Sequence, residues 1–153
     1  MIKACEVLGS VEDFVGKEVV EVKLEWYEVG KRIIKKELDN GDVIGIKFDK
    51  SVVLKPADVV AVYGDCVYVI EVLATRAFVI DVDDVDMVAK VCYELGNRHL
   101  PLFRGVGPMQ FFTPIEEPVR VLLRKLGVRV SEDVVLLVDR ICSDACHSHE
   151  LAL

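Results

Sequence analysis

The last dozen residues of this 153-residue chain hold its densest group of metal-ligating side chains. Two cysteines and two histidines fall there: Cys142, Cys146, His147 and His149. Thiolates and imidazoles are donors for Ni, Zn and Cu. Because the four donors are adjacent, and not two pairs separated by a folding loop, they favour an exchangeable metal site over a structural zinc knuckle. Two alternatives stay open: a terminus with chance Cys and His residues, and a Cys142–Cys146 disulfide, which a reducing compartment disfavours.

The third histidine, His99, follows Gly96-Asn97-Arg98 at the expected end of a helix. One imidazole does not make a site, because divalent transition metals take four or more donors. In a two-fold dimer, each chain contributes the same residue near the axis, so one histidine per chain becomes a pair. We therefore expect a homodimer whose metal ligands are the paired His99 and the tail donors. The alternative is a surface or half-buried structural histidine.

The same residues do not indicate catalysis, and we expect no enzyme. A cysteine nucleophile needs a positioned base, and no histidine besides His99 lies outside the tail. Gly105-Val106-Gly107 does not open a helix after a strand, so it predicts a hairpin turn and not a nucleotide loop. The three cysteines before the tail fall on apolar faces and are predicted to be small core residues: Cys5, Cys66 and Cys92.

Composition excludes several partners. A net charge of −7 argues against nucleic acid, whose phosphates would repel the chain. Apolar runs such as residues 134–138 are far too short to span a bilayer, so no membrane association is expected. The first residues lack the pattern of a signal peptide. With five cysteines, an odd number, this predicts a cytoplasmic protein whose cysteines are thiols or ligands.

The first half of the chain has the period-two pattern of strands. Val20, Val22 and Leu24 alternate with charged residues, which predicts one buried and one exposed face. Asp39-Asn40-Gly41-Asp42 separates two apolar runs and predicts a hairpin, because Asn-Gly tolerates positive φ. Two further runs, residues 59–62 and 66–73, are bounded by turn residues. This half is expected to be a small all-β domain of short antiparallel strands.

Helices alternate with strands from Arg76 onward. Asp83 and Asp84 are predicted to start a helix that Gly96 ends. A hairpin is expected around 105–108, then a helix with Pro118 in its first turn and Gly127 at its end, then a strand at 128–130. The order βαββαβ is that of the ferredoxin-like motif. Residues 133–141 are too densely apolar to show a period, so a strand and a helix both stay open.

The predicted fold class is α+β, with a small all-β domain followed by a ferredoxin-like domain. We place the β domain at residues 1–75 and the βαββαβ domain, expected to bind metal and to dimerise, at residues 76–140. The Cys/His tail is then residues 141–153.

Two stretches resemble the urease accessory protein UreE family, whose members are nickel metallochaperones. They are residues 38–46, Leu-Asp-Asn-Gly-Asp-Val-Ile-Gly-Ile, and residues 89–102, which contain Gly-Asn-Arg-His. The resemblance implies a β domain likened to a chaperone peptide-binding domain, and a ferredoxin-like domain that dimerises with His99 as the interfacial nickel ligand. This chain departs from the family at 112–117, where many members carry a second His cluster, and in its short tail without polyhistidine.

The resemblance implies a carrier that delivers Ni(II) to the urease apoprotein and its GTPase-containing accessory complex. Two other functions stay open. One is a carrier or sensor of Zn(II) or Cu on the same scaffold, because thiolates and the Irving–Williams order favour those ions over nickel. The other is a peptide-binding adaptor in which the β domain acts and the metal is structural.

Overall fold

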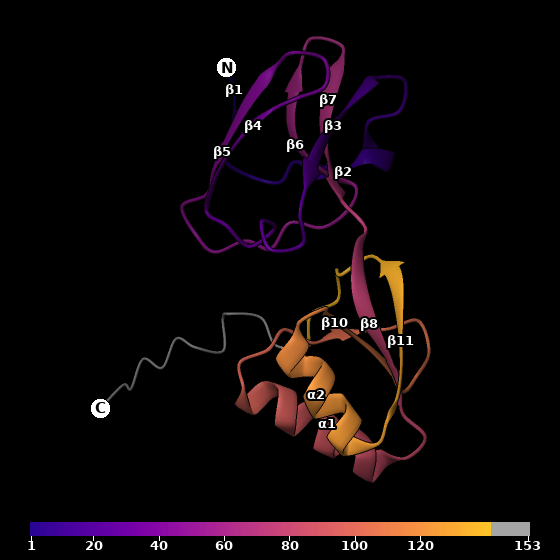
Figure 1. Ribbon diagram of the computed structural model, residues 1–153. Coiled ribbons are helices and arrows are strands. Elements are labelled where there is room, and N and C mark those ends of the chain that lie inside the picture. The colour runs from indigo at the N-terminus through magenta and orange to yellow at the C-terminus, as the bar shows by residue number, and fades with distance from the viewer. Residues whose placement is uncertain (142–153) are drawn as a thin grey trace, which may run out of the picture. The chain divides into compact units, whose positions relative to one another are not determined.

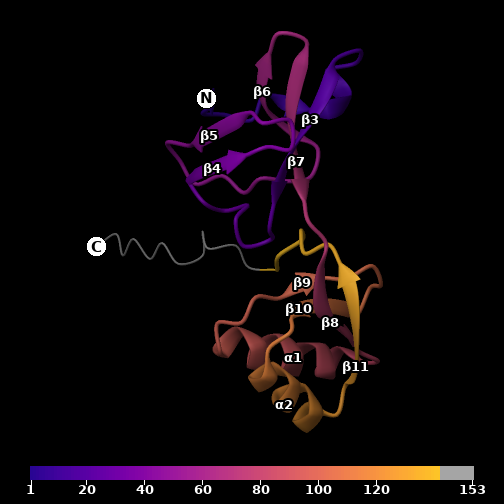
Figure 2. The same ribbon diagram turned by 45° about the horizontal axis from the view of Figure 1, so that its top comes forward.

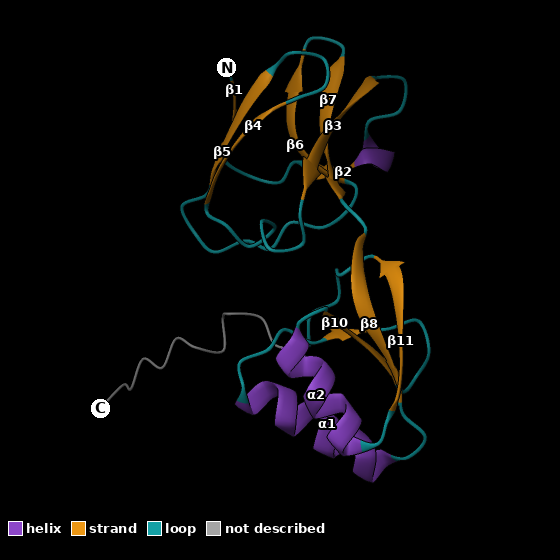
Figure 3. Cartoon of the chain, in the orientation of Figure 1, coloured by secondary structure: helices purple, strands orange, loops and turns teal. Residues whose placement is uncertain are grey.

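The computed structural model describes residues 1–141, which divide into two compact units. The first unit is Met1–Leu73 and the second begins at Ala74. Figure 3 shows that both helices belong to the second unit, whereas the first is built from strands and loops with one short helical turn. Neither helix has the length and apolar character needed to cross a membrane.

The first unit consists of two sheets that face each other across an apolar core (Figure 1). One sheet has the order β1 (Ile2–Ala4), β5 (Val43–Lys47), β4 (Ile33–Glu37). The other has the order β2 (Gly9–Ser10), β6 (Asp58–Tyr63), β7 (Cys66–Val72), β3 (Glu18–Leu24). A single turn of 3-10 helix, Val11–Asp13, follows β2.

The alternation predicted for the first unit is confirmed. Val20, Val22 and Leu24 of β3 are buried in the core, whereas Glu21 between them is exposed. Strands β4 and β5 form the predicted antiparallel hairpin. Gly41 in its turn has φ +85°, a conformation that glycine adopts without steric cost.

The prediction that all these strands run antiparallel is wrong. Strand β1 pairs with β5 in parallel, and β3 pairs with β7 in parallel over its whole length. A parallel pair needs a long crossover, and the chain between β3 and β7 supplies one by passing through β4, β5 and β6. Periodicity shows which face of a strand is buried, but it does not show the direction of the neighbouring strand.

The second unit has the predicted βαββαβ order, so the α+β fold with a ferredoxin-like domain is confirmed. Its elements are β8 (Thr75–Asp81), α1 (Val85–Asn97), β9 (Phe103–Arg104), β10 (Gln110–Pro114), α2 (Glu117–Leu126) and β11 (Arg129–Val135). The strands form an antiparallel sheet of order β11-β8-β10-β9. Both helices lie on one face of this sheet (Figure 2). Their buried residues and those of the sheet form one core, which includes Phe78, Ile80, Val91, Leu95 and Leu123.

Local sequence explains three of the four helix ends. The carboxylate of Asp84 caps α1 by accepting a hydrogen bond from the Met87 backbone N at 2.8 Å. Helix α2 has Pro118 in its first turn and ends at Gly127, which has φ +69°. The fourth end, at the C-terminus of α1, differs from the prediction and is described below.

The open question about residues 133–141 is resolved in favour of a strand without a helix. Strand β11 continues to Val135, well beyond the predicted end at residue 130. The chain then returns to the edge of the sheet beside β9. There the Arg104 N donates to the Asp139 carbonyl at 2.8 Å, and the Ile141 N donates to the Leu102 carbonyl at 2.9 Å.

Candidate metal site

Helix α1 continues past the glycine that was expected to end it, and a left-handed histidine follows its end. The prediction that Gly96 stops the helix is wrong: the helix continues through Gly96 to Asn97. The left-handed residue is His99, with φ +56°. Only Ala57 shares a positive φ among the other non-glycine residues that the structure describes. The His99 side chain is exposed.

The backbone hydrogen bonds at this end form a Schellman motif. The His99 N donates to the Gly96 carbonyl at 2.9 Å, and the Leu100 N donates to the Leu95 carbonyl at 3.0 Å. In this motif an apolar contact usually joins the two flanking positions, and here buried Leu95 and half-buried Leu100 belong to the same core cluster. His99 therefore occupies the position that glycine normally fills, and the core fixes the residue after it.

Arg98 satisfies a further carbonyl of the helix end. Because the Arg98 N bonds to Leu95, the carbonyl of Glu94 loses its usual helical donor. The Arg98 Nη1 replaces that donor, at 3.0 Å from the Glu94 carbonyl oxygen, and the same nitrogen pairs with the Glu94 carboxylate. The residue before the histidine is thus held by its backbone and by its side chain.

The chain leaves the described region close to His99. Ile141, the last described residue, pairs with Leu102, three positions after His99. The predicted ligands Cys142, Cys146, His147 and His149 lie outside the described residues. A chain spans at most about 3.3–3.6 Å per residue, so the segment from His99 to Leu102 covers no more than roughly 11 Å. Cys142 directly follows Ile141 in the sequence.

Within residues 1–141, no three His, Cys, Asp or Glu side chains gather closely enough to hold a metal ion. Three of the acidic residues around the start of α1 instead have structural partners. Asp84 caps the helix, Asp83 pairs with Arg129 at 2.6 Å, and Asp81 accepts a hydrogen bond from Gln110 at 2.9 Å. Any site that includes His99 needs donors from beyond the described part of one chain.

The three earlier cysteines do not join this site. The prediction that all three are core residues is wrong for Cys5, which is exposed. Its strand β1 ends at Ala4, so Cys5 no longer follows the alternation that buries Ala4. Cys66 and Cys92 are half-buried and pack against the two cores. Burial raises the pKa of the Cys66 thiol, as does Glu18, whose Oε2 lies 3.8 Å from Sγ.

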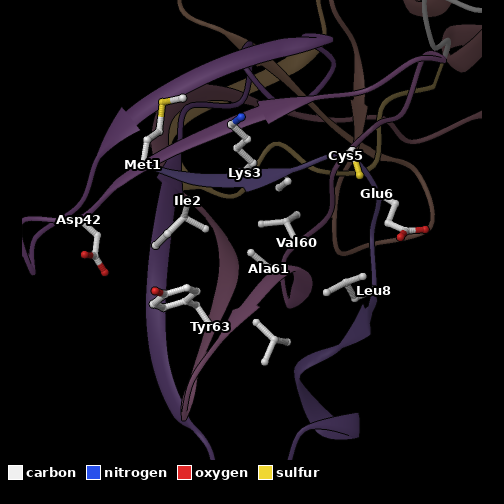
Figure 4. Close-up of a pocket in the computed structure, with 12 residues that line it drawn as sticks. Met1, Ile2, Lys3, Cys5, Glu6, Leu8, Asp42, Val60, Ala61 and Tyr63 are labelled. Atoms are coloured by element: carbon white, nitrogen blue, oxygen red, sulfur yellow. The ribbon is translucent and has the colours of Figure 1, made fainter.

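A hollow of about 650 Å³ lies in the first unit between β1 and β6 (Figure 4). Its lining is mixed, with apolar residues of both strands and the charged Lys3, Glu6 and Asp42. The Tyr68 hydroxyl donates to Asp42 Oδ2 at 2.7 Å, and this bond holds the Asp42 pKa below its usual range. No histidine lines the hollow, so its chemistry differs from that of the His99 region.

Comparison with known proteins decides the family. Residues 6–74 match the family model of the UreE urease accessory protein N-terminal domain, and residues 75–137 match that of the C-terminal domain. The chain belongs to the UreE family. The urease accessory protein UreE of Acetivibrio thermocellus is 37% identical over 111 residues, which cover 72% of this chain and 71% of that protein. The Helicobacter pylori UreE is 34% identical over 127 residues, which cover 80% of this chain and 75% of that protein.

UreE proteins are accessory proteins and not enzymes, in agreement with the sequence-based expectation. The sequence singled out His99, which stays a predicted ligand in this UreE chain, but it did not lead us to expect the left-handed backbone of that residue. A detectable signal was present: Leu95 and Leu100 are the apolar pair that flanks a Schellman motif, and they identify His99 as its left-handed residue. The pairing of residues 139–141 with β9 had no comparable local signal.

Proposed function

We propose that this protein is a homodimeric, cytoplasmic nickel carrier that delivers Ni(II) to the urease maturation complex. The proposed ligands are His99 of both chains together with tail donors, drawn from Cys142, Cys146, His147 and His149. The proposed partners are the urease apoprotein and its GTPase-containing accessory complex. Membership of the UreE family supports the accessory role in urease maturation.

The observation that carries the proposal is the arrangement around residues 99–102. The exposed imidazole of His99 lies at a helix end that is fixed by hydrogen bonds. Ile141, which precedes the four further donors in the sequence, is hydrogen-bonded to Leu102, three positions after His99. A left-handed conformation costs a residue with a Cβ about 1–2 kcal/mol. Strain of this kind is found mostly at functional sites, where the surrounding structure maintains it.

The number of donors supports the proposed dimer. The described residues of one chain contribute a single histidine to this region, whereas nickel, zinc and copper take four or more ligands. A two-fold axis beside His99 doubles the imidazoles and doubles the tail donors. Ligand exchange between interfacial imidazoles and tail donors then moves the ion without a step in which all its bonds break together.

Competition between metals tests the function. The protein is expressed with Ni(II) and Zn(II) in competition, and native mass spectrometry identifies the ion held by the dimer. We expect one tightly bound nickel per dimer, and its loss in His99→Ala with the dimer intact. Retention of nickel by His99→Ala would overturn the ligand assignment. Preference for zinc, with nickel excluded, would support the carrier or sensor of that ion instead.

A second function, binding an extended peptide of the client, is favoured by the hollow in the first unit. Strand β1 pairs only with β5, and residues 61–63 of β6 pair only with β7, so backbone groups on both borders of the hollow are open within the described residues. Such edges can pair with an added strand.

A charge placed in the hollow separates the two functions. Leu8 lines the hollow and is partly exposed, whereas the control residue Val15 is almost fully exposed outside it. If the protein is a peptide-binding adaptor, Leu8→Asp abolishes capture of the urease apoprotein without metal, and Val15→Asp and His99→Ala do not. If it is a nickel carrier, nickel transfer depends on His99 and the metal-free protein shows no such loss.

A further inference from the structure

We infer that Thr113 is a positioning residue of the His99 site: its hydroxyl fixes the segment that joins His99 to the exit of the tail. The inference rests on the proposed function. Thr113 lies in β10, fourteen positions after His99 in the sequence.

The hydroxyl of Thr113 is a polar group inside an apolar core. Its side chain is completely buried, and apart from Tyr68 it is the one buried side chain with a polar group in the part of the chain that the structure describes. A buried hydroxyl is costly unless it is hydrogen-bonded. Thr113 Oγ1 donates to the carbonyl of Pro101 at 2.7 Å, and this bond links β10 to the segment after α1.

The backbone of Pro101 depends on this hydrogen bond more than that of another residue would. Proline has no N–H, so its carbonyl is the only backbone group through which the residue can be held by a hydrogen bond. A proline also restricts the residue before it to extended conformations. That residue is Leu100, which directly follows the left-handed His99. The hydroxyl therefore fixes the direction in which the chain leaves the histidine.

Backbone hydrogen bonds fix the other residues of the segment 99–102 individually. The His99 N bonds to Gly96 and the Leu100 N bonds to Leu95 on one side of Pro101, and the Leu102 carbonyl accepts from the Ile141 N on the other. Thr113 holds the middle of this series. If its hydroxyl is removed, Pro101 can shift, and Leu102 with it. The positions of Leu102 and Ile141 relative to His99 are then lost, and the imidazole is no longer presented in one orientation.

Full-length Thr113→Val and Thr113→Ser test the inference. Valine keeps the branched shape and lacks the hydroxyl, whereas serine keeps the hydroxyl. Nickel affinity is measured by competition with a chelator, the nickel absorption spectrum reports ligand geometry, and thermal unfolding of the apoprotein reports stability. Ile80→Val, a change in the same core on β8, is the control for stability loss alone.

We expect Thr113→Val to weaken nickel binding at least fivefold and to alter the nickel spectrum. Thr113→Ser and Ile80→Val should stay within twofold of the parent with its spectrum. If Thr113→Val does not fold, Thr113→Ala replaces it with the same expectation. Parent-like binding in the variant without the hydroxyl, or an equal loss in Ile80→Val, overturns the positioning role. Nickel binding unchanged in His99→Ala would overturn the proposed function itself, which makes the two failures distinguishable.

Discussion

At the end of α1 a histidine occupies a backbone conformation that glycine adopts far more readily. His99 has φ +56°, and the hydrogen bonds of His99 and Leu100 to the last turn require it. Histidine tolerates this region better than most residues, but its Cβ still carries a steric cost. The histidine therefore lowers the stability of the folded protein relative to glycine at this position, and it places an exposed imidazole there.

Exchange of His99 for glycine and for alanine separates these two effects. We expect His99→Gly to raise the free energy of unfolding of the apoprotein by about 1 kcal/mol, because the left-handed conformation is then unstrained. His99→Ala keeps the strain and should not gain. Both variants should lose the tight nickel site. Urea unfolding and calorimetric nickel titration make the measurements, and a glycine variant less stable than the parent would contradict the strained backbone.

The raised pKa of Glu71 leads to a second prediction about a single residue. Burial raises its pKa above the ordinary value of 4.5, and the nearby Glu21 carboxylate adds to the shift. Its Oε2 is buried without a hydrogen-bond partner among the described residues. The folded protein therefore keeps this proton to a higher pH than the unfolded chain does. Stability contributed by the protonated form is lost as the pH rises from about 4.5 through the raised pKa.

Glu71→Gln removes this titration, so the variant should unfold at a higher temperature than the parent at pH 7. Below pH 4 the two should agree, because Glu71 is protonated in both folded and unfolded chains. Glu37→Gln, an exposed change in β4, is the control and should show no such pH-dependent difference. Thermal unfolding across pH 3.5–8 provides the comparison, and a difference independent of pH would refute the explanation.

At the scale of elements, the β9–β10 hairpin depends on one close approach. A Cβ on Gly105 would lie 2.7 Å from Cγ and 2.9 Å from the carbonyl carbon of Gln110. Gln110 cannot easily yield, because its side chain bonds to the Val106 N at 3.0 Å and to Asp81 at 2.9 Å. On Gly107 the nearest atom is 3.5 Å away, an ordinary contact.

Gly105→Ala should therefore destabilise the protein by about 1–3 kcal/mol, the usual cost of forcing extra atoms into a packed site. Gly107→Ala, two residues away, is the matched control and should cost much less. Chemical denaturation measures both. Equal losses in the two variants would show that the hairpin does not depend on the contact with Gln110.

The elements that sequence predicted well are those whose information is local. The Asn40-Gly41 turn, the alternation in β3 and the ends of α2 each depend on side chains within a few positions of one another. The parallel pairing of β3 with β7 and the return of residues 139–141 to β9 depend on partners far away in the chain. The end of α1 was placed at Gly96 and not at the left-handed His99, because a glycine alone does not identify the last turn.

At the scale of the whole molecule, the two units divide the proposed tasks. We propose that the unit beginning at Ala74 carries the dimer contact and the metal. A fragment that starts at Ala74 should then remain dimeric in sedimentation experiments and bind nickel. Its stability should be marginal, because so small a domain buries a limited core. A monomeric fragment that is folded would assign the dimer contact to the first unit.

Removal of residues 142–153 tests how much the tail contributes to nickel binding. We expect the dimer to persist, since Ile141 and its bond to Leu102 are kept. Nickel should bind more weakly, because two imidazoles leave coordination positions for water. Thiolate ligands would also give the full-length protein an intense sulfur-to-nickel absorption band that the truncated protein lacks. A full-length nickel complex without this band would exclude the cysteines as ligands.

The anchoring of Ile141 beside β9 determines the local concentration of the proposed tail ligands around this part of the protein. A chain spans at most about 3.5 Å per residue, so a ligand eight residues beyond Ile141, as proposed for His149, would stay within roughly 28 Å of that anchor. One donor confined to such a sphere is present at on the order of 10 mM, and each donor nearer the anchor at more. An ion on His99 would therefore encounter the chain's own ligands far more often than free competitors in solution. A recipient could overcome this advantage by binding the carrier and presenting its own donors inside the same volume.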